Sequence, residues 1–236
     1  MKDEEDSAEE MSYGVQHSLR KFQHRQGGRK REDQPAILNR IGFSGGLTVV
    51  DLGCGDGYYA IPISRLIGPH GTVYAVDKSS VALSAIDENL GTLEADSGNI
   101  RKVLADMSHT NIESGSVDII FIANSFHNAE NKQDLIKEIR RLIRMGGRVV
   151  DIDWLKMETP FGPPYSIRLE ESEVESLFRE YGFLLEDKFY FEPYHYCLTF
   201  RSTTSLPTKE ENLKTNLEKS PDSIRASQQK VRGGSD

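Results

Sequence analysis

Between residues 33 and 202, short apolar runs alternate with segments whose apolar residues recur at the spacing of a helix face. The apolar runs predict strands over residues 47–52, 71–77, 99–106, 116–124, 148–155, 183–191 and 194–200. The other segments predict helices over residues 33–41, 58–67, 79–91, 131–147 and 172–181. Because strands and helices alternate, we expect an α/β fold with a mostly parallel sheet and helices on both of its faces.

The last two apolar runs have no helix between them. Only a short connection around "EPYH" joins residues 183–191 to residues 194–200. Parallel neighbours need a long crossover, whereas antiparallel neighbours need only a turn. This part of the chain therefore predicts a hairpin that adds one antiparallel strand to the sheet.

Local signals predict where several helices begin and end. The segment "SSVALSAIDENLG" has a serine cap and a glycine stop, at Gly91. In residues 131–147, Ile143 lies on the same helical face as the apolar residues before it. Ser172 and Glu175 have the spacing of a capping box, which predicts that they start the last helix.

The two ends of the chain are polar. Residues 1–32 change from acidic to basic and predict a solvated arm, or alternatively a lid whose basic residues face an anionic group. Residues 203–236 contain no aromatic residue and predict a disordered tail. Residues 33–202 remain as the folded domain.

Composition narrows the class of protein. The charged content of 28% and the lack of a long apolar run argue against a membrane span. The acidic start is unlike a signal peptide, and two cysteines, Cys54 and Cys197, are too few for a disulfide framework or a four-cysteine metal site. We therefore expect a cytoplasmic protein without a metal. The net charge of −8 weighs against nucleic-acid binding, although the basic stretch at residues 20–31 keeps a nucleic-acid substrate open.

Polar residues follow the expected strands at their carboxyl ends, where open parallel sheets bind ligands. These residues are Asp51 with a glycine loop, Asp77, Asp106, the run from Asn124 to His127, and Asp153 with Trp154.

The glycine loop reads "DLGCGDGYY". Glycine lets the backbone turn tightly and approach a ligand closely. Dinucleotide sites use G-x-G-x-x-G, but here Gly53, Gly55 and Gly57 are followed by Tyr58 where the third glycine would stand. No phosphate-binding P-loop motif is present in the sequence. A purely structural turn between strand and helix would also explain these glycines.

Two acids extend the pattern. Asp77 can accept hydrogen bonds from a ribose diol, or it can cap the helix that follows. Asp106 can accept a hydrogen bond from an adenine amino group while Met107 packs on the ring, or it can be an ordinary turn aspartate.

Together these motifs resemble the class I S-adenosylmethionine-dependent methyltransferases, and within them the broad group of small-molecule enzymes. The resemblance covers residues 33–202. It is carried by "VVDLGCGDG", "VYAVDKS", "LADMSH", "VDIIFIANSFHN" and "LIRMGGRVVDIDW". It implies a doubly wound, Rossmann-like sheet of seven strands whose last strand is antiparallel, with S-adenosyl-L-methionine as cofactor and a small-molecule methyl acceptor.

The resemblance also implies roles for single residues. The residues expected to bind the cofactor are Asp51, Leu52, Gly53, Cys54, Gly55, Gly57, Asp77, Lys78, Asp106, Met107, Asn124 and Ser125. His127 is the candidate general base, because imidazole titrates near neutrality; alternatively it only orients the substrate or packs. The segment after residue 153 is expected to face the acceptor through Trp154, Lys156, Tyr165 and Arg168.

The sequence argues against several subclasses of methyltransferase. Amino-methylating DNA enzymes carry an N-P-P-Y-like run where this chain has "NSFH", and quinone C-methyltransferases carry an arginine–asparagine signature that "SFHNAEN" lacks. Cytosine C5 and arsenic methyltransferases need cysteines that this chain does not place suitably. A non-catalytic cofactor-binding protein, a methyltransferase acting on a protein or nucleic acid, and a nicotinamide-dependent oxidoreductase remain as alternatives.

Overall fold

The computed structural model of the protein describes residues 33–92, 98–191 and 193–203. The expected N-terminal arm and most of the expected C-terminal tail lie outside these residues, so neither expectation can be compared with the structure.

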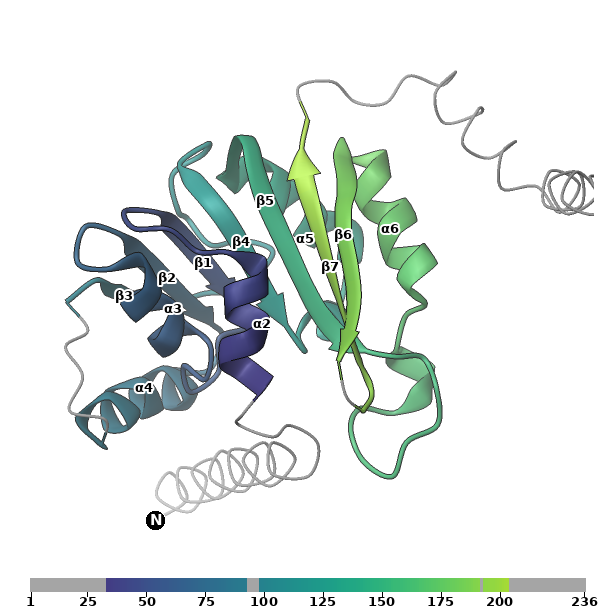
Figure 1. The fold of residues 1–236 in the computed structure, drawn as a ribbon, viewed down its shortest axis with the longest axis horizontal. Helices are drawn as coiled ribbons and strands as arrows, with labels where there is room; N and C mark the ends of the chain where they lie inside the picture. Colours follow the sequence, from purple (N-terminus) through teal and green to yellow (C-terminus); the bar gives the residue numbers. More distant parts are fainter. Residues whose placement is uncertain (1–32, 93–97, 192, 204–236) are drawn as a thin grey trace, which may run out of the picture.

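The described chain contains the strands and helices that the apolar pattern predicts (Figure 1). The helices are α2 (Asp33–Ile41), α3 (Ala60–Ile67), α4 (Ser80–Thr92), α5 (Lys132–Leu142) and α6 (Glu171–Glu180), with short 3₁₀ turns η1 (Phe126–Asn128) and η2 (Tyr165–Ile167). The strands are β1 (Thr48–Leu52), β2 (Thr72–Asp77), β3 (Ile100–Leu104), β4 (Val117–Ala123), β5 (Ile143–Trp154), β6 (Phe183–Phe191) and β7 (His195–Ser202).

All seven strands join one sheet in the order β3-β2-β1-β4-β5-β7-β6. Strands β1 to β5 pair in parallel, whereas β7 runs antiparallel to both β5 and β6. The expected seven-stranded α/β fold and its C-terminal hairpin are therefore confirmed. No helix of the described residues is long and apolar enough to cross a membrane.

The helices form two layers around the sheet (Figure 1). Residues of α2, α3 and α4 pack with one face of the strands, and residues of α5 and α6 pack with the other. The central strands are therefore buried on both faces, which explains why β1 and β4 read as continuous apolar runs. Edge strand β6 instead alternates buried and exposed positions over much of its length.

Three expected helix ends are wrong. Ile143 does not continue α5, because the chain turns there and Ile143 pairs with Val117 as the first residue of β5. The cap of α6 is Glu170, whose box partner is Glu173, so Ser172 lies inside the helix. The serine cap of α4 is confirmed, since Ser79 Oγ accepts the Ala82 N–H at 3.2 Å. Its glycine stop is wrong by one residue, because α4 extends to Thr92.

Candidate active site

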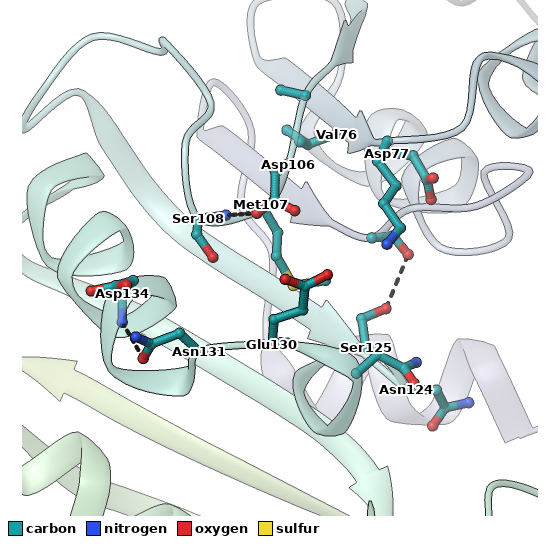
Figure 2. Close-up of a pocket in the computed structure, with 15 residues that line it drawn as sticks. Val76, Asp77, Asp106, Met107, Ser108, Asn124, Ser125, Glu130, Asn131 and Asp134 are labelled. Carbon is teal, nitrogen blue, oxygen red and sulfur yellow. Dashed lines mark hydrogen bonds between the residues drawn. The ribbon is translucent and has the colours of Figure 1, made fainter.

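A cavity opens where the strand order reverses, at the carboxyl ends of β1 and β4. The chain leaves β1 for α3 on one face of the sheet and leaves β4 for η1 and α5 on the other, so the two connections diverge. The cavity there measures about 560 Å³, and small-ligand sites commonly measure about 300–1,000 Å³. Figure 2 shows side chains from several segments surrounding it. It is lined by Gly53, Val76, Asp77, Lys78, Ala105, Asp106, Met107, Ser108, Asn124, Ser125, Asn128, Ala129, Glu130, Asn131 and Asp134.

Gly53 begins the loop after β1 and lines the cavity with its backbone. Its φ of 73° lies in the left-handed region, and its N–H donates to the Val76 carbonyl at 2.9 Å. A Cβ added at Gly53 would lie 2.4 Å from Ser125 Oγ. Glycine is therefore required here both by the backbone conformation and by the contact between the β1 and β4 loops.

Asp77 holds the same loop from the end of β2. Its carboxylate accepts the Gly55 N–H at 2.9 Å through one oxygen and the Ser79 N–H at 2.9 Å through the other. The side chain is 7% exposed and lines the cavity. A carboxylate has about four acceptor positions, so lone pairs remain for a ligand. Asp77 thus supports the turn into α4 and is also placed to accept hydrogen bonds from a ligand in the cavity.

Asp106 and Met107 approach the cavity from the connection after β3 (Figure 2). Asp106 accepts the Ser108 N–H at 2.8 Å through its side chain and the His109 N–H at 2.9 Å through its carbonyl. The turn that Asp106 forms is local, yet its exposed carboxylate also faces the cavity. Met107 packs against the apolar cluster beneath α5.

Asn124 has a conformation that suggests a ligand contact. Its φ is 55°, one of two positive values among non-glycine residues of the described chain, and its N–H donates to the Ile152 carbonyl at 2.7 Å. Its side-chain oxygen is buried without a hydrogen-bond partner in the described residues. A buried polar atom without a partner is costly, so a bound molecule that pairs with it would stabilise this conformation.

The other residues expected to bind the cofactor lie at the end of β1 or in the loop after it, and they do not line the cavity: Asp51, Leu52, Cys54, Gly55 and Gly57. Leu52 is fully buried in the core, and Asp51 is 1% exposed. Burial raises the pKa of the Cys54 thiol, and the nearby Asp51 and Asp77 carboxylates raise it further. A raised pKa disfavours the thiolate that would act as a nucleophile, so Cys54 serves as a small buried filler of the loop.

A second polar group lies behind the end of β4. The imidazole Nδ1 of His127 lies 2.7 Å and 2.9 Å from the two carboxylate oxygens of Asp153, at the end of β5. The Asp153 carboxylate also accepts the backbone N–H of His127 at 3.2 Å and that of Trp154 at 2.8 Å. His127 does not line the cavity, but Ser125 and Asn128 on either side of it do.

The residues expected to face the acceptor do not line the cavity, although the Arg168 guanidinium lies over the Trp154 ring, 5.1 Å from its centroid. Trp154 is 7% exposed and packs on Phe161 and Tyr194, Lys156 lies 3.4 Å from Glu173, and Tyr165 is 45% exposed.

Arg168 is committed to the loop that carries it. Its guanidinium donates to the carbonyls of residues 155, 157, 161 and 163 and to the Thr159 hydroxyl, over 2.5–3.3 Å. These five contacts use the five N–H donors that an arginine has, so none is left for an anionic group.

Several cavity residues were not anticipated. Glu130, Asn131 and Asp134 line the cavity from the connection that leads from β4 into the first turn of α5. Their position after β4 is a signal that could have found them, because carboxyl ends of parallel strands meet at one edge.

Comparisons with known proteins agree with this geometry. The family described as "Methyltransferase domain" matches residues 49–147. A Sulfolobus solfataricus protein assigned to the type 11 methyltransferases is 33% identical, with a TM-score of 0.60 over 78% of this chain and 98% of that one. A SAM-dependent methyltransferase from Aquifex aeolicus is 25% identical, with a TM-score of 0.66 over 72% of this chain and 89% of that one. The chain belongs to the class I S-adenosylmethionine-dependent methyltransferase superfamily.

Curated relatives match a smaller part of the chain. Demethylmenaquinone methyltransferase of Lactococcus lactis is 32% identical over 116 residues, which are 49% of this chain and 45% of that protein. The chain thus spans about half the length of such relatives. The family match ends at residue 147, before the segments that follow β5.

Proposed function

We propose that the protein transfers a methyl group from S-adenosyl-L-methionine to a small-molecule acceptor. One observation carries the proposal: Gly53, Asp77 and Asn124 converge on one cavity at the point where the strand order reverses. The crystal structure from Aquifex aeolicus, described as a SAM-dependent methyltransferase, supports the choice of cofactor.

The cavity residues suit the parts of this cofactor. Asp77 would accept the ribose hydroxyls through its remaining lone pairs, and Asp106 and Met107 would hold adenine. The backbone around Gly53 would approach the amino-acid part, and the buried oxygen of Asn124 would find its missing partner in the cofactor or the acceptor. The acidic lining, with Glu130 and Asp134 added, favours a ligand that carries positive charge.

Bound S-adenosylmethionine supplies a methyl carbon on a positively charged sulfur, which an electron pair of the acceptor displaces in line. For such a displacement, catalysis consists mainly of holding the acceptor in line with the carbon–sulfur bond. The protein would contribute this positioning through the connection after β4, whose residues line the cavity.

A small-molecule acceptor is supported by two observations. The net charge of −8 opposes non-specific binding of a nucleic acid, and the cavity has the volume of a small-ligand site. The segments after β5 lie outside the family match, so the acceptor of a relative is a weak guide to the acceptor here.

The first test is calorimetric binding of S-adenosylmethionine to the full chain. We expect Asp77→Asn to weaken binding on the order of tenfold, about 1.4 kcal/mol, because one hydrogen bond to a charged group is lost. Asp87→Asn is the matched control. The Asp87 side chain is exposed on the outer face of α4 and pairs with Lys102, and it does not line the cavity. If the wild-type protein does not bind the cofactor, the proposal is wrong.

The second test is transfer of a labelled methyl group to a panel of phenols, thiols, amines and metalloid acceptors. Transfer to any of these compounds supports the proposed activity. Tight cofactor binding with no transfer to any compound would instead favour a non-catalytic cofactor-binding protein.

A further inference from the structure

The contacts of Asp153 determine how His127 is oriented. A carboxylate can only accept hydrogen bonds, so the His127 Nδ1 that lies 2.7 Å from it must carry the proton. In the neutral ring this leaves a lone pair on Nε2. Nε2 has no hydrogen-bond partner in the described part of the chain, and the side chain retains 5% exposure. His127 is thus held as a base with one free nitrogen.

A second carboxyl lies behind the first. Asp151 is two residues before Asp153 on the same face of β5, and it is fully buried. Within the described residues no backbone N–H donates a hydrogen bond to the Asp151 carboxyl. The Tyr196 hydroxyl is the neutral polar group that lies near this carboxyl. Tyr196 lies directly across from Asp153 in β7.

The two carboxyls have opposite surroundings. Asp153 accepts three N–H groups, which favour its ionised form, whereas burial raises the pKa of Asp151 well above its usual range. The negative charge of Asp153 raises it further. Of the two carboxyls, Asp151 is therefore the one that favours its protonated form, because it is fully buried and has no hydrogen-bond donor from the backbone within the described residues.

Other charged groups around the pair agree with this assignment. Burial raises the pKa of Tyr196, and the negative charges of Asp153 and Glu171 raise it further, so Tyr196 remains a neutral hydroxyl. The Arg168 guanidinium is attracted to Asp153. The Lys132 ammonium donates to the backbone carbonyl of His127 at 3.3 Å and not to its imidazole ring.

We propose that His127 removes a proton from the methyl acceptor, that ionised Asp153 orients it, and that neutral Asp151 with Tyr196 keeps the charge on Asp153. This inference rests on the proposed methyltransferase function and names its acceptor class: a molecule with an ionisable O–H, S–H or C–H bond. That bond breaks, its proton goes to His127 Nε2, and its electron pair forms the bond to the methyl carbon. The carbon–sulfur bond breaks at the same time, and its electron pair stays on sulfur. Tertiary amines and thioethers, which have no proton to lose, are outside this class.

The orientation is tested without cofactor, through the ¹⁵N chemical shifts of the His127 ring. We expect the wild-type protein to show the Nδ1–H form, Asp153→Asn to lose this preference, and Asp151→Asn to keep it, because an amide resembles a neutral carboxyl. An infrared band of a protonated carboxyl should be present at neutral pH and absent from Asp151→Asn. If that band is absent from the wild-type protein, or if Asp153→Asn leaves the His127 shifts unchanged, the proposal is overturned.

The chemical role is tested with cofactor. We expect His127→Gln to bind S-adenosylmethionine as the wild type does and to lose about 10²–10⁴-fold in transfer rate to a phenol or thiol. His70→Gln, at an exposed turn, is the matched control and should retain both properties. An unchanged transfer rate in His127→Gln, or efficient transfer to tertiary amines, would contradict the acceptor class.

Different results would overturn the proposed methyltransferase function and the proposed role of His127. Loss of cofactor binding by the wild type would remove the proposed function, while the ring shifts would still decide how Asp153 holds His127. Should Asp153→Asn fail to fold, His127→Gln and the infrared band still decide the proposal.

Discussion

Replacing Gly53 by alanine tests how closely the β1 and β4 loops approach each other. The new Cβ would lie 2.4 Å from Ser125 Oγ and 2.7 Å from Ser125 Cβ, far inside van der Waals contact. Ser125 is 8% exposed, and its single hydroxyl proton is shared between the carbonyls of Gly53 and Ala123, each at 3.2 Å. The serine can therefore move away only by giving up this shared hydrogen bond.

The size of the effect follows from two contributions. A left-handed backbone costs an alanine roughly 1–2 kcal/mol relative to glycine. The shared hydrogen bond that Ser125 loses costs roughly 0.5–1.5 kcal/mol. We therefore expect Gly53→Ala to lower the free energy of unfolding by about 1.5–3.5 kcal/mol.

The chain offers a matched control in Gly42. Its φ of 72° equals that of Gly53 within one degree, but a Cβ added there meets no atom within 4 Å. Gly42→Ala should therefore cost only the backbone contribution of roughly 1–2 kcal/mol. Urea unfolding of both variants at one pH measures the difference, which is the cost of the contact with Ser125.

A double-mutant cycle completes the test. In a Ser125→Gly background the obstructing side chain is absent, so Gly53→Ala should cost no more than Gly42→Ala does. Equal losses for Gly53→Ala and Gly42→Ala in the native background would refute the reasoning. So would a loss for Gly53→Ala that Ser125→Gly fails to relieve.

Three further predictions concern other parts of the fold. Burial opposes the ionisation of Glu138, but hydrogen bonds from Arg141 and Thr110 lower its pKa from 4.5 to about 2. The pKa of Glu138 is lower in the folded protein than in the unfolded protein. The stabilisation by its ionised form is therefore complete above about pH 4.5 and is lost as the pH falls toward 2. The urea midpoints of Glu138→Gln and of the wild type should therefore converge as the pH approaches 2. Arg168→Met should lower stability on the order of 3 kcal/mol and open residues 155–167 to protease, because several carbonyls lose their donor; unchanged cleavage would contradict this. Cys54 should resist thiol reagents until the protein unfolds, since burial and neighbouring carboxylates raise its pKa; rapid native labelling would show otherwise.

Much of the fold could be predicted because each element has a local signal. Buried parallel strands read as apolar runs, and helices repeat their apolar residues at their own period. Three helix ends were predicted wrongly, at Gly91, Ile143 and Ser172, and at the last two the local signal was ambiguous. Ile143 fits a helix face, yet its pairing with Val117 in the sheet decides its conformation. Ser172 fits a cap, yet Glu170 and Glu173 form the box instead.

Part of the candidate site was equally accessible. Gly53, Asp77, Asp106 and Asn124 follow successive strands, and the carboxyl ends of parallel strands share one edge of the sheet. The pattern could not assign Arg168 correctly, since a lone arginine after a strand looks the same whether it faces a ligand or carbonyls of its own loop.

The sequence by itself determined the order of strands and helices, the position of the glycine loop and the acids that follow the next two strands. These depend on residue type and on spacing along the chain. Only the tertiary structure decided that Asp153 orients His127 and that Asp151 lies buried behind it, because those contacts join β5 to the η1 turn 26 residues away. Side-chain distances and burial set the charge of each carboxyl, and neither quantity is contained in local spacing.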